Sequence, residues 1–329
     1  MGLRLGLAGL GNHGRRYARH LLAGEVAGAR LTAVSRRDRD SGLRFARDNG
    51  LSFVPDPSDL AARDDVDAVV VVLSPDLHPA TASAALSAGK PVLVEKPLAP
   101  DVASARDLAG EVSRTGTLLM VAHTLRFDPL IERMKREAAT LGALRMLSIN
   151  QRFEPSGLSW IDRPGAGGIV LNTGVHGFDL LRFFSGREAV SVRAECRRTL
   201  TRQTEDQFSA LVRLEPDGVQ AVLDNSRATR SRSGRIEIVC EAGQLWGDHI
   251  HRTLQRVRGR EVTDLGPVPA LPTIPRTLEA FVRCVREDTP PPVGVADGVA
   301  AVEMVEAALL SARRGGGEGG TVSISTPDG

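Results

Sequence analysis

The chain has 329 residues, of which 42% are hydrophobic and 25% charged, a balance that is typical of globular proteins and, at this length, of two domains. Its formal net charge of +2 excludes the strong positive field of proteins that bind nucleic acid or anionic membranes, and no apolar run is long enough to span a membrane. The three cysteines are scattered and form no CxxC pair, which argues against a disulfide framework or a zinc site and favours the reducing cytoplasm.

Apolar strands alternate with helices in the first part of the chain. The pattern predicts strands at 3–10, 29–37, 68–73, 91–97 and 118–123, with helices at 12–24, 39–50, 80–89 and 102–116. Strands that alternate with helices form a parallel sheet covered on both faces. We therefore expect a doubly wound Rossmann domain over residues 1–124.

The second part of the chain, from residue 125 to residue 329, has a different pattern. A helix at 129–140 precedes long β-rich segments at 143–153, 189–200, 206–225 and 235–247. Their alternation and their turn dipeptides predict an α+β domain with a large, mostly antiparallel open sheet. A proline-rich connector at 266–275 leads to two helices at 276–288 and 296–313, which could pack back on the first domain.

A glycine motif, Gly9-x-Gly11-x-x-Gly14, follows the first strand and opens the first helix. In this context the motif predicts a dinucleotide site, with Gly9 in the tight turn, Gly11 at the pyrophosphate and Gly14 where helix and strand pack. Asn12 and His13 belong to the same turn and are assigned to the same site. The alternative is a glycine-rich turn that holds no ligand.

The end of the second strand bears on the choice of cofactor. NAD-binding folds usually carry an acid there for the ribose hydroxyls, whereas this chain has Ser35, Arg36 and Arg37. A hydroxyl and two guanidinium groups could hold a 2′-phosphate, so the sequence favours NADP(H) over NAD(H). The alternative is that the two arginines are solvated surface charges.

Four ordered motifs carry a family resemblance: GLAGLGNHG (6–14), SPDLHP (74–79), VEKPLA (94–99) and GAGGIVLNTGVHGFDLLRFFSG (165–186). With them the chain resembles the Gfo/Idh/MocA family of NAD(P)-dependent oxidoreductases over nearly its whole length. The resemblance implies a Rossmann domain followed by a domain with a large open sheet, which is often the oligomer interface. It also implies substrates that are sugars, sugar derivatives or cyclitols.

The resemblance assigns Lys96 to the nicotinamide ribose and the substrate hydroxyl, and it implies a cis bond between Lys96 and Pro97. A lysine at the carboxyl end of a buried parallel strand can donate to a reacting oxygen and relay its proton. The alternative is a lysine that only reaches from the strand end into solvent. The same motifs assign four further residues to the cofactor: Ser74, Pro75, His78 and Glu95. His78 could equally be a packing residue at the start of a helix.

A second constellation lies in residues 169–184. If this segment is helical, Asn172, His176 and Asp179 are spaced by four and three and share one face. The family pattern is Asp-x-Gly-x-His-x-x-Asp, and it implies that His176 is the catalytic acid and base. The chain departs from the pattern at Asn172, because an amide cannot take up a proton.

Other residues are assigned to the substrate or set aside. The resemblance places Arg126 near the substrate, with a surface ion pair as the alternative, and Trp160 and Arg163 along the approach to the site. His249 and His251 have no cysteine or acidic third ligand nearby, so we interpret them as surface residues and expect no metal site.

Together these features predict an oxidoreductase that interconverts a secondary alcohol and a ketone on a carbohydrate-like substrate, with Lys96 and His176 as the proton-transfer pair. We expect a homodimer or homotetramer formed through the C-terminal sheet. Two alternatives remain open: a cofactor-binding sensor or partner protein without turnover, and a glycoside hydrolase that uses tightly bound NAD.

Overall fold

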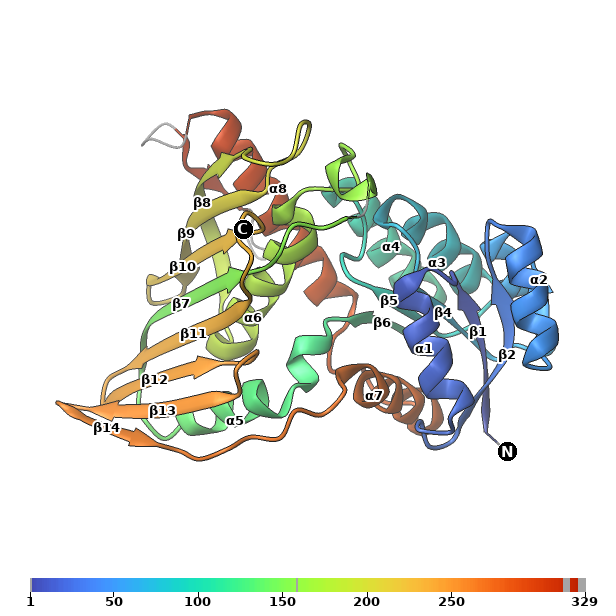
Figure 1. Cartoon of the computed structure of the whole chain (residues 1–329), viewed down its shortest axis with the longest axis horizontal. Helices are drawn as coiled ribbons and strands as arrows, with labels where there is room; N and C mark the ends of the chain where they lie inside the picture. Colours follow the sequence, from blue (N-terminus) through green and yellow to red (C-terminus); the bar gives the residue numbers. More distant parts are fainter. Residues whose placement is uncertain (1, 158, 316–319, 325–329) are drawn as a thin grey trace. The chain divides into compact units, whose positions relative to one another are not determined.

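The computed structural model describes residues 2–157, 159–315 and 320–324. The chain divides into two compact units. Unit 1 comprises residues 1–124 and 272–299, and unit 2 comprises residues 125–271 and 300–329. Figure 1 labels the helices and most strands of the two sheets. No helix in the described ranges is long and apolar enough to span a membrane.

Unit 1 is built on a six-stranded, wholly parallel sheet with the order β3-β2-β1-β4-β5-β6. The strands are β1 (Leu3–Ala8), β2 (Ala29–Ser35), β3 (Ser52–Val54), β4 (Ala68–Val71), β5 (Val92–Glu95) and β6 (Leu119–Ala122). This order is that of the doubly wound dinucleotide-binding fold, and it reverses between β1 and β4, where such sheets bind their ligands.

Every residue of β4, β5 and β6 is buried, which indicates that helices cover both faces of this sheet. The helix α1 packs against α7, and α3 packs against α4. The helices of this unit are α1 (Asn12–Leu22), α2 (Arg39–Asp48), α3 (His78–Ser87), α4 (Val102–Thr115) and α7 (Thr273–Glu287). Short 3₁₀ turns occur at Pro57–Ala62 and Pro75–Leu77.

Unit 2 is built on a nine-stranded sheet with the order β14-β13-β12-β11-β7-β10-β9-β8-β15. All neighbouring strands are antiparallel except β7 and β10, which run parallel. The strands are β7 (Leu144–Arg152), β8 (Glu188–Arg197), β9 (Gln207–Glu215), β10 (Val219–Ser226), β11 (Ser233–Cys240), β12 (Gly243–Asp248), β13 (Thr253–Arg258), β14 (Glu261–Asp264) and β15 (Val322–Ser323).

One face of this second sheet is covered by helices. Inward residues such as Leu147, Ile149, Val212 and Leu223 join apolar residues of the helices in one buried cluster. The helices are α5 (Pro129–Ala138), α6 (Val175–Ser185) and α8 (Val295–Arg313), the last of which contributes to the cluster from residue 301 onward. The predicted fold class, a doubly wound parallel sheet plus a large, mostly antiparallel sheet, is confirmed.

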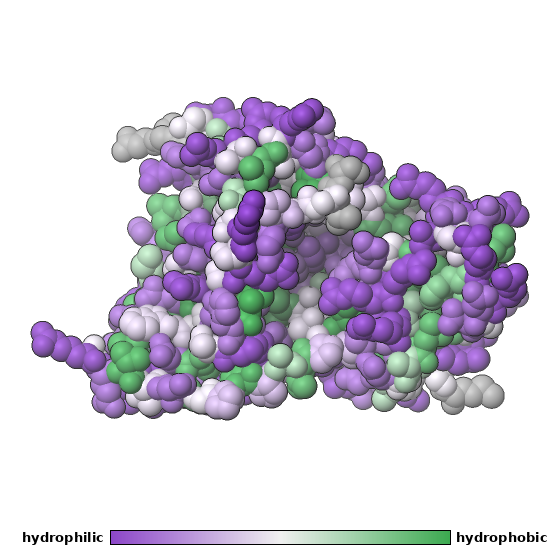
Figure 2. Space-filling view, viewed as in Figure 1, coloured by the Kyte–Doolittle hydropathy of each residue, from purple (hydrophilic) through white to green (hydrophobic). Residues whose placement is uncertain are grey.

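The opposite face of the second sheet carries the alternate residues of the same strands. Met146 and Trp246 are exposed to 39% and 41%, and Leu211 pairs with Val222 across neighbouring strands. On the surface in view in Figure 2, hydrophobic residues form small groups among hydrophilic ones. In the part of the chain that the structure describes, the exposure of Met146 and Trp246 makes this helix-free face partly apolar.

Candidate functional site

The glycine turn between β1 and α1 is shaped for a close approach of backbone groups. Gly9 has a φ of +101°, and a Cβ there would overlap the carbonyl of Val72. A Cβ at Gly14 would overlap the carbonyl oxygen of Gly9, whereas a Cβ at Gly11 would meet no atom within 4 Å. The open space at Gly11, at the N-terminus of α1, fits a pyrophosphate held by backbone N–H groups.

Glu95 connects this turn to the end of β5. Its carboxylate lies 2.7 Å from Nε2 of His13, accepts a hydrogen bond of 2.6 Å from the hydroxyl of Tyr17, and accepts one of 3.0 Å from the backbone N–H of Lys96. Glu95 and Tyr17 are buried, while the His13 side chain is 45% exposed. The buried carboxylate therefore joins the first turns of the helix α1, which follow the glycine turn, to the lysine of the Glu-Lys-Pro motif.

The electrostatics of this group favour the ionised carboxylate. Burial alone would raise the pKa of Glu95, but the charge and hydrogen bond of His13 outweigh it, together with Lys96 and Tyr17, and lower the pKa to about 2. Burial raises the pKa of Tyr17 well above its ordinary value, and the nearby carboxylate of Glu95 raises it further. The Tyr17 hydroxyl therefore keeps its proton and remains a hydrogen-bond donor. Glu95 acts here as an anchor between segments.

Lys96 directly follows β5, at the same edge of the sheet as the glycine turn, and its bond to Pro97 is cis, as the resemblance implies. His78 lies beside this turn but is buried. Its Nδ1 is 2.8 Å from the carbonyl oxygen of Pro97 and its Nε2 is 3.1 Å from that of Leu73. Burial lowers the pKa of His78, so the neutral ring donates to one of the two carbonyls. The packing alternative therefore describes His78 better than a cofactor contact.

Two other residues assigned to the cofactor lie in the turn after β4. Ser74 is half-buried and precedes the short 3₁₀ turn, and Pro75 is buried at its first position. This turn follows the strand next to β1, so it occupies the same carboxyl edge of the sheet as the glycine turn.

The three residues at the end of β2 that were predicted to hold a 2′-phosphate have different surroundings. Ser35 is buried and its hydroxyl donates to the carbonyl of Pro55 at 3.4 Å, which differs from the predicted accessible phosphate ligand. Arg36 donates from Nη1 to the carbonyl oxygen of Leu10 at 2.6 Å, so its guanidinium lies beside the glycine turn, and Arg37 is exposed. Of the three residues, the two arginines therefore remain candidates for contact with a 2′-phosphate at the carboxyl edge of the sheet.

In unit 2, the segment that contains Asn172 and His176 is not a uniform α-helix. Residues Val170–Gly174 form a π-helical turn, and α6 begins only at Val175. The Asn172 side-chain amide donates to the carbonyl oxygen of Gly168 at 2.9 Å and lies 3.5 Å from that of Ala166. π-helical turns often occur at functional sites.

The predicted polar face is therefore wrong in its details. His176 is half-buried in the first turn of α6, whereas Asp179 is buried and forms a bidentate ion pair with Arg126, at distances from 2.6 to 3.1 Å. The π turn widens the helix, so Asn172 turns back to the glycine segment while Asp179 binds Arg126. Since the Arg126 side chain is 10% exposed and Asp179 1%, this pair differs from the surface ion pair considered as an alternative.

The loop that carries Trp160 is held by carboxylates. Trp160 is half-buried in a 3₁₀ turn at Ser159–Asp162, and Arg163 is exposed. Asp162 accepts three backbone hydrogen bonds, of 2.8 to 2.9 Å, from residues 202–204, and these bonds lower its pKa to about 2. Glu205 accepts a hydrogen bond of 3.0 Å from the backbone of Val170. The β8–β9 loop thus braces the π turn.

The two histidines near residue 250 behave differently from each other. His249, interpreted from the sequence as a surface residue, is only 8% exposed, and burial lowers its pKa. The His251 side chain is 60% exposed and its Nδ1 lies 2.9 Å from Asp248. Asp248 ends β12, so both histidines belong to the connection to β13, where the chain turns and directs His249 inward.

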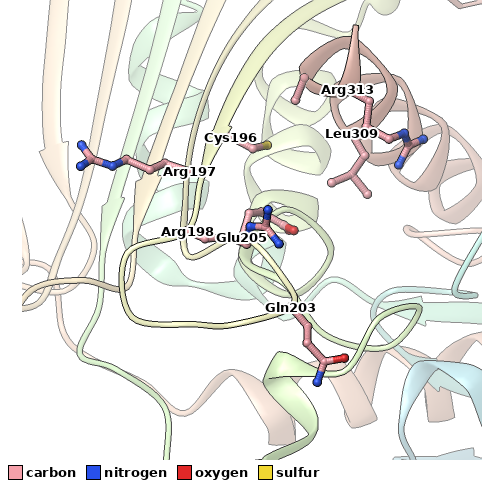
Figure 3. A pocket seen from close by; sticks show the side chains of 8 residues that line it. Cys196, Arg197, Arg198, Gln203, Glu205, Leu309 and Arg313 are labelled. Carbon is pink, nitrogen blue, oxygen red and sulfur yellow. The ribbon is translucent and has the colours of Figure 1, made fainter. Parts of the chain in front are cut away.

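A pocket of about 260 Å³ lies elsewhere in unit 2, at the end of β8. Figure 3 shows the thiol of Cys196 directed toward α8, with Arg197 and Arg313 directed away from each other. Burial, followed by the charge of Glu205, raises the pKa of Cys196 to about 12, so this thiol is not a nucleophile at neutral pH. The lining residues are Cys196, Arg197, Arg198, Gln203, Glu205, Leu309, Ala312 and Arg313.

Comparisons with known proteins identify the family. The model of the oxidoreductase family with an NAD-binding Rossmann fold, Gfo/Idh/MocA, matches residues 3–123, and the model of the Gfo/Idh/MocA C-terminal domain matches residues 133–246. The chain belongs to the Gfo/Idh/MocA family. This confirms the predicted family and the predicted class of enzyme, an NAD(P)-dependent oxidoreductase.

Several named relatives of this Gfo/Idh/MocA protein are inositol dehydrogenases. Inositol 2-dehydrogenase 4 of Saccharopolyspora erythraea is 33% identical over 256 residues, which are 75% of this chain and 74% of that protein. Myo-inositol 2-dehydrogenase of Thermotoga maritima is 28% identical over 94% of this chain and 96% of its own length. A crystal structure described as a probable dehydrogenase from Thermotoga maritima has a TM-score of 0.83 at 26% identity and covers 98% of both chains.

Sequence reasoning missed several residues that shape these sites. Tyr17 lies among the apolar residues of α1, a position that predicts only a buried side chain, yet its hydroxyl donates to Glu95. Arg227 follows β10 and donates to Thr173 in the π turn, but nothing distinguishes it from the other arginines of an arginine-rich chain. Contacts between residues so distant in sequence leave no local pattern.

Proposed function

We propose that this oxidoreductase interconverts a secondary alcohol and a ketone on a sugar, a sugar derivative or a cyclitol. The proposal is supported by the inositol dehydrogenases to which the chain is similar over most of its length. The observation that carries it is the placement of Lys96 directly after β5, at the sheet edge that also holds the glycine turn.

The residues of unit 1 fit a nicotinamide dinucleotide. The glycine turn leaves open space at Gly11, and backbone N–H groups at the start of α1 would hold the pyrophosphate. A nicotinamide bound here would supply the acceptor or donor for the hydride of the substrate carbon. The Glu95 carboxylate fixes the backbone of Lys96 relative to this turn.

In the proposed mechanism, Lys96 and His176 handle the proton. The Lys96 ammonium donates a hydrogen bond to the reacting oxygen, and His176 takes up the hydroxyl proton during oxidation and returns it during reduction. An imidazole suits this exchange because its ordinary pKa is near neutrality. Asn172 contributes no proton, since its amide donates to Gly168.

The first prediction concerns this pair. Lys96→Met and His176→Ala should each lower kcat by about 10²- to 10⁴-fold, because each removes a proton-transfer group. The measurement is nicotinamide absorbance with purified protein and a panel of cyclitols and sugars, with each dinucleotide in turn.

Matched controls are Lys90→Met and His251→Ala, which change a lysine bonded to the carbonyl of Arg63 and an exposed histidine. Both should keep wild-type turnover. Wild-type turnover in both test variants would exclude the mechanism. Glycoside hydrolysis by protein that retains its dinucleotide and needs none added would support the hydrolase alternative instead.

We also propose that the cofactor is NADP(H) rather than NAD(H). The proposal is supported by Arg36, whose guanidinium lies beside the glycine turn, and by Asp38, whose carboxylate caps α2 through the N–H of Ser41 at 3.2 Å. No acid therefore occupies the end of β2, where an NAD-binding fold carries one.

The preference for NADP(H) over NAD(H) can be tested by binding measurements. Wild-type protein should bind NADP⁺ more tightly than NAD⁺, and Arg36→Ala should weaken NADP⁺ binding by about tenfold, since one charge-assisted contact to phosphate is lost. Calorimetric titration with both dinucleotides measures this, and Arg39→Ala, an exposed arginine in the first turn of α2, serves as control. Tighter binding of NAD⁺ to the wild type would contradict the proposal.

We further propose that the protein is a homodimer or homotetramer formed through the second sheet. The support is the helix-free face of that sheet, which exposes Met146 and Trp246 and pairs Leu211 with Val222. Apolar faces of open sheets are commonly covered by a second copy.

A further inference from the structure

Arg227 directly follows β10, at the point where the two parallel strands of the second sheet end together. Ser226 of β10 is opposite Arg152 of β7, and the N–H of Phe153 donates to the carbonyl of Ser226 at 2.9 Å. Arg227 and Phe153 are thus the first residues beyond two neighbouring strand ends.

The guanidinium of Arg227 is partly buried, and no carboxylate among the described residues offsets its charge. Its Nε and Nη2 donate to the hydroxyl oxygen of Thr173 at 3.2 and 2.8 Å. Its Nη1 makes no hydrogen bond, and no carboxylate forms an ion pair with it, within residues 2–157, 159–315 and 320–324. Removing a cation from water without an anionic partner is unfavourable, so a bound anion would stabilise this position.

Neighbouring arginines differ because each has an acidic partner. Arg232 pairs with Glu154 at 2.7 Å, and Arg152 pairs with Asp224 at 2.6 Å. Arg227 and Arg232 both lie against the ring of Phe153, at 5.9 and 5.5 Å from its centre. Burial lowers the pKa of Arg227, and the like charge of Arg232 lowers it further. The surroundings of Arg227 therefore add a second positive charge and do not offset its own.

The position of Thr173 connects Arg227 to the proposed chemistry. Thr173 is buried in the π turn and precedes His176 by three residues in one continuous helical segment. Arg227 therefore contacts the turn that leads directly into the helix of the histidine proposed to move the substrate proton, and all of these residues belong to unit 2.

We propose that Arg227 binds an anionic group of the substrate, so that the substrate is a sugar or cyclitol that carries a carboxylate or a phosphate. The planar guanidinium fork matches both groups, and its free Nη1 adds a donor to those that contact Thr173. The inference rests on the proposed function for the nature of the reaction, but the binding of the anion can be tested apart from turnover.

The test compares matched compounds on the purified protein with saturating dinucleotide. Neutral hexoses, the hexuronates of the same stereochemistry and the corresponding hexose phosphates are compared by thermal shift and by kcat/KM. We expect one anionic series to raise Tm more than its neutral counterpart and to have a kcat/KM higher by about tenfold or more. The carboxylate and phosphate series distinguish the two sources of the charge.

Variants locate the effect. Arg227→Gln, which keeps a donor for Thr173, should lower kcat/KM for the anionic compound by about 30-fold or more and change that for the neutral compound by less than about threefold. Arg227→Lys should recover part of the loss, because the charge is restored. Arg232→Gln, which removes an exposed and already paired charge, is the matched control and should have a small effect.

Three results would overturn the inference: neutral compounds used as well as anionic ones, an equal loss for both series in Arg227→Gln, or equal thermal shifts by both series in the wild type. Absence of turnover with every compound would count against the proposed function. In that case the thermal shifts alone decide the inference, since a larger shift by an anionic series that disappears in Arg227→Gln supports it and equal shifts refute it.

Discussion

Glu95 binds three groups of unit 1 through one buried carboxylate, so its loss should destabilise the unit. We predict that Glu95→Gln lowers the free energy of unfolding by about 1–3 kcal/mol, because the amide cannot satisfy His13, Tyr17 and the Lys96 N–H together. Denaturant unfolding measures this. His13→Ala, which removes a half-exposed partner, should cost less.

The same residue gives a pH dependence with a defined sign. The pKa of Glu95 is lowered from 4.5 to about 2 in the folded protein, so its stabilising effect is complete above about pH 4.5 and is lost as the pH falls toward 2. The difference in Tm between the wild type and Glu95→Gln should therefore shrink over this range. A difference that stays constant down to pH 2 would contradict the assignment.

Asn172 departs from the family pattern, and the structure gives this departure a physical meaning. Its amide donates to the carbonyl of Gly168, which has a φ of +88°, and a carboxylate cannot donate there. We predict that Asn172→Asp destabilises the protein by about 1–3 kcal/mol at neutral pH and does not raise turnover. A stable and faster variant would show that this amide has no structural role.

At this scale the sequence predicted which motifs matter better than it predicted where their side chains point. The glycine turn and the cis bond before Pro97 follow the motifs closely. His78, Asn172 and Asp179 instead bind backbone carbonyls or a neighbouring arginine. The partners of His78 and Asp179 lie 19 and 53 residues away in the sequence, and Gly168, the partner of Asn172, precedes the segment predicted to be helical, so a helical wheel or a local motif could not reveal them.

At the scale of elements, hydrophobic periodicity located most strands and helices within a few residues. It missed the hairpin of β13 and β14, because its residues are largely polar and only Leu254 and Val257 are buried. It also missed the π turn at Val170–Gly174, since an apolar run fits an α-helix and a π turn equally well.

The brace on the π turn can be tested through Glu205. Burial raises the pKa of this carboxyl, so its ionisation destabilises the folded protein as the pH rises through the folded pKa. Glu205→Gln still accepts a hydrogen bond from Val170 and should raise Tm at pH 7–8, with no gain at pH 4, where the wild-type group is protonated. A lower Tm at neutral pH would mean that the charged hydrogen bond matters more than burial.

At the scale of the whole molecule, the helix-free face of the second sheet carries the proposal of self-association. We predict that Met146→Glu combined with Val222→Glu lowers the oligomeric state measured by light scattering after size exclusion, because buried charges oppose association. Leu200→Glu, at a residue exposed to 58% in a loop, is the control and should leave the state unchanged. An unaltered assembly in the double variant would place the interface elsewhere.

The division of the chain into units has a consequence for synthesis. Unit 1 is built from segments that precede and follow residues 125–271 in the sequence. These segments contact each other, because α7 packs against α1 and the N–H of Val121 donates to the carbonyl of Val293 at 2.9 Å. A nascent chain that has just left the ribosome with its first 124 residues therefore exposes the surface of α1 that α7 later covers. Truncated fragments that end before residue 272 should consequently depend on chaperones, whatever their affinity for a dinucleotide.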